Sequence, residues 1–192
     1  MLRTDGLAVD YAAADGAVVR ALHGVSFSIG NSEALGVLGE SGSGKSSLAL
    51  ALLRLLPANA RVAGMIDFQG RELLRLKASE LRRVRGAEVA LISQEPALAL
   101  NPVLTIGRQV GDVLRAHSPE SRGKQKQRVR EILQEVGFED PDRVMRAYPH
   151  QISGGQRQRA AIAQALVCRP SFLIADEPLS SLDTVTQAEL LE

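Results

Sequence analysis

A short run of residues in the first quarter of the chain has the composition and spacing of a phosphate-binding loop. The run Gly39-Glu40-Ser41-Gly42-Ser43-Gly44-Lys45-Ser46 follows the pattern G-x-x-x-x-G-K-S. In such a loop the backbone N–H groups surround an anion, the lysine reaches the terminal phosphates and the serine hydroxyl binds Mg²⁺. Gly42 and Gly44 allow backbone angles and a close approach that a Cβ atom would block. These residues, together with Ser47, are therefore predicted to bind the phosphates of a nucleotide.

The segments on either side of this loop predict the elements that position it. Ala34–Leu38 is a short apolar run that predicts a buried strand, and Ser47–Leu53 predicts the opening of a helix. A strand, a glycine-rich turn and a helix N-terminus direct several N–H groups and the helix dipole at one anion. The alternative is a Gly/Ser-rich linker that contains Lys-Ser by chance, which residue frequencies make a roughly 1% event in a chain of this length.

A pair of carboxylates follows another apolar run much later in the chain. Phe172–Ala175 predicts a buried strand, and Asp176 and Glu177 come directly after it. Carboxylates at the end of a buried strand lie where open parallel sheets bind ligands. In phosphate-loop ATPases the first acid holds Mg²⁺, and the second is placed to orient or deprotonate the attacking water. An ordinary strand-to-turn exit is the alternative, since such residues also favour turns; the phosphate-binding loop upstream favours the catalytic interpretation.

Composition limits the classes of function. The chain of 192 residues has a net charge of +1 and 3% aromatic residues, which disfavours nucleic acid as the main partner. Cys168 is the only cysteine, which indicates a reducing compartment and a small buried residue rather than a reactive thiol. No run approaches the roughly 18 apolar residues of a membrane span, and the N-terminus lacks a signal-peptide hydrophobic region. We therefore expect a cytoplasmic protein whose membrane connection runs through a partner.

Further strands are predicted from short apolar or alternating runs. Glu88–Ile92 reads as a buried strand that ends just before Gln94. Three N-terminal segments show more alternation of apolar and polar residues, which is typical of an antiparallel layer. These segments are Leu7–Tyr11, Val25–Ile29 and Met65–Phe68.

The middle of the chain is predicted to be helical. Ile106–His117 and Lys124–Val136 carry apolar residues at helical spacing, with charges on the other face. Ser118-Pro119-Glu120 predicts a helix start, and Gly137 predicts a helix stop. The basic stretch Arg122–Arg128 is more often a solvated helix face than a binding patch.

A second glycine-containing motif precedes the acidic pair. Ser153 is predicted to cap a helix whose free N–H groups face an anion. A resemblance to the signature sequence of ATP-binding-cassette (ABC) ATPases begins here. It covers Ser153-Gly154-Gly155-Gln156, the following Arg-Gln-Arg and the amphipathic segment Ala160–Leu166. A helix cap with a Gly-Gly turn is the plainer alternative, but it does not explain the extension or the order of the motifs.

The resemblance implies a fold and an organisation. It implies an α/β P-loop NTPase fold of the ABC type, with a mixed RecA-like core, an N-terminal antiparallel β layer and an inserted helical subdomain. The chain then reads as one incomplete domain over residues 1–192, in which 1–96 and 160–192 form the nucleotide-binding core. Residues 97–159 form the helical subdomain with the signature, and the last core strands of the family are missing.

The resemblance also implies the cofactors and the role of each site residue. ATP and Mg²⁺ are the expected ligands, with Lys45 and Ser153 stabilising phosphoryl charge and Glu177 acting on water. Mg²⁺ would be held by Ser46, Gln94 and Asp176, and Gln94 resembles the Q-loop glutamine linked to the transport partner. Tyr11 stands in place of the aromatic residue that stacks on adenine, with a half-buried strand tyrosine as the alternative. Asp183, in Ser181-Leu182-Asp183, resembles the D-loop that crosses the dimer interface.

Finer features resemble the oligopeptide, dipeptide and nickel importer subfamily. The first is the phosphate-binding loop with Glu40-Ser41. The others are Gln94-Glu95-Pro96 followed closely by Leu100–Gly107, the segment Tyr148–Gln151, and Cys168-Arg169-Pro170. This kinship implies ATP binding and hydrolysis that power import of oligopeptides, dipeptides or a related small solute. It implies a second ABC ATPase subunit in a homo- or heterodimer, and transmembrane permease subunits at the cytoplasmic face of the membrane. It also implies an indirect link to a periplasmic or extracellular solute-binding protein, and no nucleic acid.

Departures from the family pattern leave other interpretations open. Ser93 and Leu179 replace more usual residues, and we expect both changes to be tolerated. The strand that carries the switch histidine in this family is absent. Because that strand is a neighbour of the phosphate-loop strand, we expect an exposed apolar core, low stability and little ATP turnover from the chain alone. Thr184–Glu192 reads as a helix start with no following strand. The alternatives are a non-transport ABC ATPase in DNA repair, chromosome organisation or translation, a phosphate-loop kinase or GTPase, and a degenerate non-hydrolysing fragment.

Overall fold

The chain divides into two compact units, which are described separately. The structure, a computed structural model, describes residues 1–94 and 96–177. The first unit is Met1–Arg82 and the second is Arg83–Glu192. None of the helices among the described residues combines the length and the apolar character that a membrane span requires.

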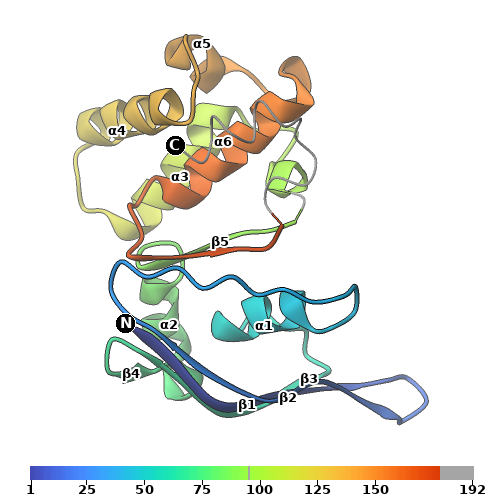
Figure 1. Cartoon of the computed structure of the whole chain (residues 1–192). Coiled ribbons are helices and arrows are strands. Elements are labelled where there is room, and N and C mark those ends of the chain that lie inside the picture. Colours follow the sequence, from blue (N-terminus) through green and yellow to red (C-terminus); the bar gives the residue numbers. More distant parts are fainter. Residues whose placement is uncertain (95, 178–192) are drawn as a thin grey trace. The chain divides into compact units, whose positions relative to one another are not determined.

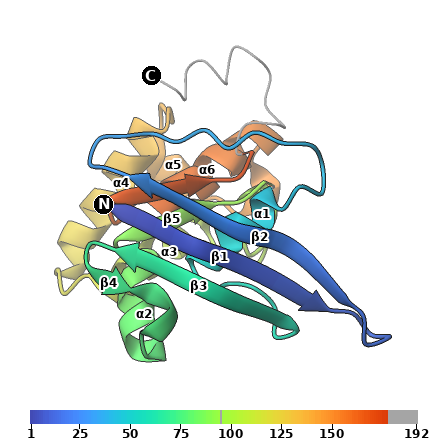
Figure 2. The ribbon, with the colours of Figure 1, turned by 60° about the horizontal axis from the view of Figure 1, so that its bottom comes forward.

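A four-stranded antiparallel sheet forms the first unit. Its strands β1 (Leu2–Ala12), β2 (Val18–Ile29), β3 (Ala60–Phe68) and β4 (Arg71–Glu72) are arranged in the order β2-β1-β3-β4, as Figure 2 shows. Buried residues alternate along β1 on both sides of an irregularity between Thr4 and Leu7, as expected for a sheet with one face in a core: Leu2 and Thr4 before it, Leu7 and Val9 after it. The predicted antiparallel N-terminal layer is therefore confirmed.

Short helices complete the first unit. Helix α1 (Lys45–Leu52) follows the phosphate-binding loop, as predicted, and contacts β2. Its buried residues Leu48, Ala51 and Leu52 belong to the apolar core of this unit, together with Phe68 of the sheet. A 3-10 helix η1 (Leu73–Arg75) and α2 (Ala78–Val84) follow the sheet.

The predicted buried strand before the phosphate-binding loop is wrong. Ala34–Leu38 belongs to no strand of the described sheets, and its backbone has no regular secondary structure. Leu35 and Val37 are each 48% exposed and Leu38 is 96% exposed. A buried strand needs hydrogen bonds and cover from neighbouring strands, and no described strand pairs with this run. Apolar side chains of Leu35, Val37 and Leu38 are therefore exposed in this segment, where the sequence analysis expects exposed apolar core.

The second unit is built mainly of helices. Its elements are β5 (Val89–Ile92), η2 (Pro96–Ala99), α3 (Ile106–His117), α4 (Arg122–Glu135), α5 (Pro141–Arg146), η3 (Pro149–Gln151), α6 (Gly154–Leu166) and β6 (Phe172–Ala175). Helices α3 and α6 lie side by side, α4 packs on both, and α5 packs on α3 and α4 (Figure 1). Their apolar faces form one core that includes Ile106, Val110, Leu133 and Ile162. The unit therefore gets its stability from packed helix faces.

The helix boundaries are close to those predicted, with one correction. The structure has α3 over the predicted residues and α4 within two residues of the predicted bounds. The helix start predicted at Ser118-Pro119-Glu120 is wrong, because the Ser118 N–H donates to the Leu114 carbonyl at 2.7 Å and so ends α3. Ser121 is the residue that precedes α4. Gly137 has a φ of +87° just after this helix, which confirms it as the predicted stop.

Candidate nucleotide-binding site

The phosphate-binding loop has the backbone that its glycines were predicted to provide. Gly42 and Gly44 have φ values of +81° and +95°, in the region that favours glycine. A Cβ atom on Gly44 would lie 2.5 Å from the Ala21 carbonyl oxygen and 3.0 Å from a methyl carbon of Leu22. Gly44 is therefore required both by its own backbone angle and by the strand packed against it.

Lys45 lies over the backbone of this loop. Its ammonium donates to the carbonyl oxygens of Gly39 at 2.8 Å and Glu40 at 3.0 Å. Helix α1 begins at Lys45, and no side chain caps its N-terminus. A helix N-terminus carries partial positive charge, so the loop combines that charge, the ammonium and backbone N–H groups around one position. The Ser46 side chain next to it is exposed.

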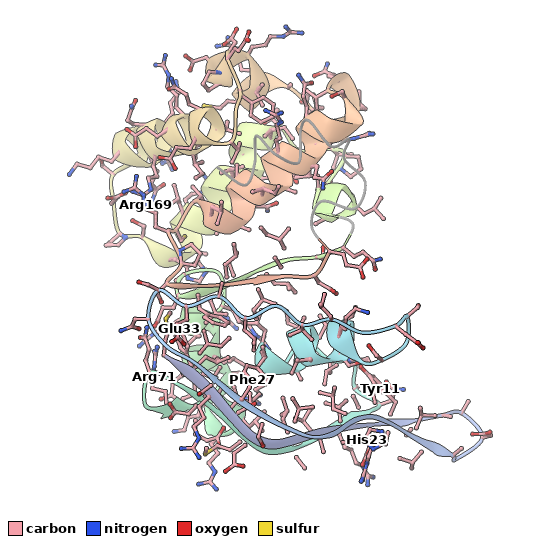
Figure 3. All side chains as sticks on the ribbon, in the orientation of Figure 1. Tyr11, His23, Phe27, Glu33, Arg71 and Arg169 are labelled. Carbon is pink, nitrogen blue, oxygen red and sulfur yellow. The ribbon has the colours of Figure 1, made fainter. Side chains whose placement is uncertain are left out.

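Two of the predicted nucleotide-contacting residues meet beside this loop. The hydroxyl of Tyr11, near the end of β1, lies 3.0 Å from the Ser47 hydroxyl on α1, and Figure 3 shows where Tyr11 stands. The tyrosine is half-buried, which also fits the alternative of an ordinary strand residue. The hydrogen bond joins β1 to the first turn of α1. Stacking of Tyr11 on adenine stays a prediction.

A charged pair holds the hairpin next to Tyr11. The Arg20 guanidinium of β2 donates to the two carboxylate oxygens of Asp10 at 2.7 and 3.0 Å. Hydrogen bonds from Arg20 hold the pKa of Asp10 below its ordinary value, and the same carboxylate raises the pKa of Arg20.

The second unit places three predicted polar residues at one edge of a small parallel sheet. In the pairing of β5 with β6, Ile92 lies opposite Ala175, and the Asp176 N–H donates to the Ile92 carbonyl at 2.9 Å. Gln94 and Glu177 therefore follow the two strands at the same edge. The Gln94 side-chain Nε2 donates to Glu177 Oε2 at 3.1 Å. These residues lie at the carboxyl end of parallel strands, as expected. The predicted burial of Phe172–Ala175 is wrong, because Leu173 is 43% exposed and none of the four residues of β6 is fully buried.

Glu177 has an unusual backbone for its residue type. Its φ is +48°, in the left-handed region, and its side chain is exposed. For a residue with a Cβ atom this conformation costs about 1–2 kcal/mol. Such residues cluster at functional sites, where the surrounding structure holds them in place. The backbone thus presents this carboxylate to solvent at a local energetic cost.

The predicted cap of the signature helix is confirmed. The Ser153 hydroxyl accepts from the Gln156 N–H at 3.2 Å, and the Gln156 side chain accepts from the Ser153 N–H at 3.1 Å. This reciprocal pair is a capping box at the start of α6. Ser153, Gly155 and Gln156 also line an open groove of about 910 Å³, together with Arg143 and Arg159.

Two structural glutamines were not predicted from the sequence. Gln109, 4% exposed in α3, accepts from the Asn101 N–H and donates to the carbonyls of Asn101 and Leu104 at 2.7–3.0 Å. It fixes the loop that precedes α3. Gln158, 2% exposed, is buried in α6. The only sequence signal for either is a polar residue on the apolar face of a predicted helix.

Cys168 behaves as the small core residue that was predicted. It is half-buried and packs against the core of the second unit. Burial raises the pKa of its thiol, and the nearby Arg128 opposes this only in part. Because the thiolate is the reactive form, the raised pKa keeps the side chain unreactive at neutral pH.

The oxygen donors predicted to hold Mg²⁺ suit that ion in chemical type. Ser46 offers a hydroxyl oxygen, Gln94 an amide oxygen and Asp176 a carboxylate. Mg²⁺ binds oxygen ligands and is usually held by only one or two protein carboxylates. Within the described residues, no group of three or more His, Cys, Asp or Glu side chains could hold a metal by itself. Several residues named in the sequence analysis lie outside the described residues. They are Leu179, the motif Ser181–Asp183 with Asp183, and Thr184–Glu192.

Comparisons with known proteins agree with these features. A solved dimeric, post-hydrolysis structure of the ATP-binding cassette MJ0796 bound to ADP and Pi has a TM-score of 0.87 and 27% identity. That match covers 100% of this chain and 80% of the MJ0796 chain. The fold is therefore that of an ABC-type ATPase cassette, a mixed α/β architecture with an antiparallel N-terminal sheet. The model of the family described as "ABC transporter" matches residues 22–180. The chain belongs to the ABC transporter family.

Curated relatives are similar over most of this chain. "Probable peptide ABC transporter ATP-binding protein y4tR" of Sinorhizobium fredii is 47% identical over 91% of the chain and 52% of its own length. The dipeptide transport ATP-binding protein DppD of Bacillus subtilis is 45% identical over 92% of the chain and 53% of its own length. The chain thus spans about half the length of the curated relatives it matches.

Proposed function

We propose that this chain binds ATP at residues 39–47 and, as one subunit of a dimer, hydrolyses it to power a peptide importer. The observation that carries the proposal is the loop itself. It combines two left-handed glycines, an uncapped helix start and the Lys45 ammonium 2.8 and 3.0 Å from two loop carbonyls. On arrival of a nucleotide, Lys45 would exchange these carbonyls for phosphate oxygens, which carry more charge.

The remaining ligand roles are proposed from the resemblance of these motifs to those of ABC ATPases. Tyr11 stacks on adenine, and Ser153 with Gly154, Gly155 and Gln156 faces the γ-phosphate held by a partner cassette, where Asp183 also crosses the interface. Ser46, Gln94 and Asp176 would hold Mg²⁺, which would neutralise phosphate charge when bound. Lys45 and the backbone N–H groups of the loop stabilise the charge that develops on the transferred phosphoryl group.

Glu177 is proposed as the residue that orients or deprotonates the attacking water. Gln94 donates to its Oε2 at 3.1 Å, which fixes this carboxylate beside the proposed Mg²⁺ ligand Gln94, and a carboxylate can take a proton from water. The positive φ of +48° supports this role, since it holds the carboxylate at the sheet edge rather than in the packed core.

The transported substrate and the partners are proposed from the relatives. Two relatives at 47% and 45% identity carry names for peptide and dipeptide transport, which supports oligopeptide, dipeptide or related import. The proposed partners are a second ABC ATPase subunit, permease subunits contacted through the helical subdomain, and indirectly a solute-binding protein. The division into a core (1–96 and 160–192) and a helical subdomain (97–159) is part of the same proposal, as is a place at the cytoplasmic face of the membrane.

Replacement of Glu177 by Gln tests the proposal. We expect Glu177→Gln to lower ATP turnover of the assembled transporter by roughly 10²–10⁴-fold, which is the range for a lost general base. ATP affinity, measured by titration calorimetry, is expected to remain. Glu120→Gln removes another exposed carboxylate of the second unit and is the control. Equal loss of binding and turnover in Glu177→Gln would reject the assigned role.

A further inference from the structure

A hollow of about 180 Å³ opens where α3, α4 and α5 meet in the second unit. Gly107 and Gly111 of α3, one turn apart, are among the residues that line it, and Met145 packs directly against Gly107. Val129, which is 2% exposed, and Met145 form its apolar wall. A single buried water needs only roughly 10–15 Å³. The hollow therefore has room for a larger polyatomic group.

The rim of this hollow is basic. Arg115 of α3 and Arg122 and Lys126 of α4 line it, and no carboxylate is among its described lining residues. Arg115 already pairs with Asp112 on its own helix. Within the part of the chain that the structure describes, the side chains of Arg122 and Lys126 have no hydrogen bond or ion pair. Two exposed cations are thus available for a ligand in the hollow.

The position of these cations is unfavourable for the helix that carries them. The first turn of α4 contains no acidic residue, and Arg122, Lys124 and Lys126 all lie near its start. Positive charge at a helix N-terminus opposes the helix dipole, which favours anions there. An anion between Arg122 and Lys126 would offset both this effect and the mutual repulsion of the two side chains.

We propose that this hollow binds one phosphate group, held by Arg122 and Lys126 beside Gly111. The planar guanidinium of Arg122 suits two phosphate oxygens at once, and the Lys126 ammonium supplies a point charge. The phosphate belongs to a soluble phosphate compound or to a phospholipid headgroup. The sequence predicts that Arg122 and Lys126 belong to a solvated helix face, and we propose a binding site for them instead. It is a different site from the phosphate-binding loop, since every residue that lines it belongs to the second unit.

The test uses the full chain with Lys45→Ala as background, so that the phosphate-binding loop does not dominate the signal. Binding of inorganic phosphate is measured by calorimetry at constant ionic strength, with amide chemical shifts of α4 to locate it. We expect Arg122→Gln with Lys126→Gln to weaken binding about tenfold or more, because two charge-assisted contacts are lost. Lys124→Gln removes a neighbouring charge of α4 that does not line the hollow, and is the matched control.

A variant that changes the shape of the hollow but none of its charges tests whether the hollow itself is needed for binding. A Cβ atom on Gly111 would lie 3.3 Å from Arg115 Nη1 and 3.8 Å from a Val129 methyl, so Gly111→Ala fits with a small shift. It keeps every charge and adds a better helix former. We expect it to remain folded and to weaken phosphate binding by filling part of the hollow.

A second arm identifies the source of the phosphate. Flotation with vesicles of phosphatidylcholine containing phosphatidylglycerol is compared with flotation on pure phosphatidylcholine. Binding only to the anionic vesicles, lost in the double variant and kept in Lys124→Gln, assigns the site to a lipid headgroup. Binding of inorganic phosphate with the same dependence assigns it to a soluble ligand. Absence of both, equal losses in Lys124→Gln, or full binding by Gly111→Ala would overturn the proposal.

Discussion

Helices α1 and α6 both begin at a glycine-rich motif, yet their N-termini are built differently. Helix α1 has 8 residues, and Gly44 at its start is left-handed with no side-chain cap. Helix α6 has 13 residues, and Ser153 and Gln156 cap its start reciprocally. The first start depends on backbone shape and leaves its N–H groups without a side-chain partner. At the second start, side chains accept from two N–H groups, those of Ser153 and Gln156.

This difference separates a helix start that depends on a ligand for its stability from one whose fold is held by side-chain caps. The loop before α1 is surrounded by exposed residues, including Leu35 and Leu38, whereas α6 packs Ala160, Ile162 and Ala163 into a core. A free helix N-terminus with a nearby ammonium gains the most from a bound anion. We therefore expect nucleotide to stabilise the first unit, while the start of α6 forms without any ligand.

Gly44→Ala is expected to have the largest effect on stability. The new Cβ atom would stand 2.5 Å from the Ala21 carbonyl at a φ of +95°. Strain of about 1–3 kcal/mol for the backbone and a similar amount for overpacking suggest a loss of roughly 2–6 kcal/mol. Thermal and urea denaturation measure it. Gly123→Ala, where nothing lies within 4 Å, is the control and should be neutral or slightly stabilising. Similar stability of the two variants would mean that backbone shape does not set the start of α1.

Lys45→Ala should act on the ligand rather than on the fold. Its ammonium contacts only loop carbonyls in the described structure, at 2.8 and 3.0 Å, so little core packing is lost. Charge-assisted hydrogen bonds are worth about 1.5–3 kcal/mol, which corresponds to a roughly 10–150-fold weaker ATP affinity. Calorimetry with ATP measures this affinity, and Lys124→Ala is the control on α4. Unchanged affinity in Lys45→Ala would place the nucleotide elsewhere.

Ser153→Ala should have a smaller effect, confined to the start of α6. Loss of a serine cap costs about 1 kcal/mol, while Ser153→Gly costs only a few tenths. The two variants therefore separate the cap from the side-chain volume, and hydrogen exchange of the first α6 amides reports the change. ATP affinity of the chain alone should not change in either variant. A fall in that affinity would show that the two helix starts depend on each other within one chain.

The same contrast explains which parts of the fold could be predicted. Ile106–His117 was predicted at its observed bounds because helical periodicity and local hydrogen bonds lie within the segment itself. Ala34–Leu38 has an equally apolar sequence, but a buried strand depends on partners that are distant in sequence. The start of α4 was misplaced because Ser118 and Ser121 are both good helix caps, and only the Ser118–Leu114 hydrogen bond decides between them.

The candidate site shows the same limit. The positive φ values of Gly42 and Gly44 and the Ser153 cap were predictable, since each follows from residue type and short spacing. The Gln94–Glu177 hydrogen bond joins residues 83 positions apart, so it needed the parallel register of β5 and β6. The left-handed backbone of Glu177 has no local sequence signal at all, because a glutamate rarely adopts it.

The smallest expected effect concerns the hairpin that carries Tyr11 and depends on pH. Arg20 lowers the pKa of Asp10 in the folded chain relative to the unfolded chain, so this pair stabilises the fold above the ordinary carboxyl pKa of 3.8. That contribution is lost as pH falls through the lower, folded pKa. Because the pair is exposed, its contribution at neutral pH is small. Arg20→Gln should therefore raise the Asp10 pKa toward its ordinary value, as followed by NMR titration of its carboxyl carbon. Arg3→Gln, which removes a looser pair 3.8 Å from Asp5, is the control. An Asp10 pKa that stays low in Arg20→Gln would mean that another group holds the charge beside Tyr11.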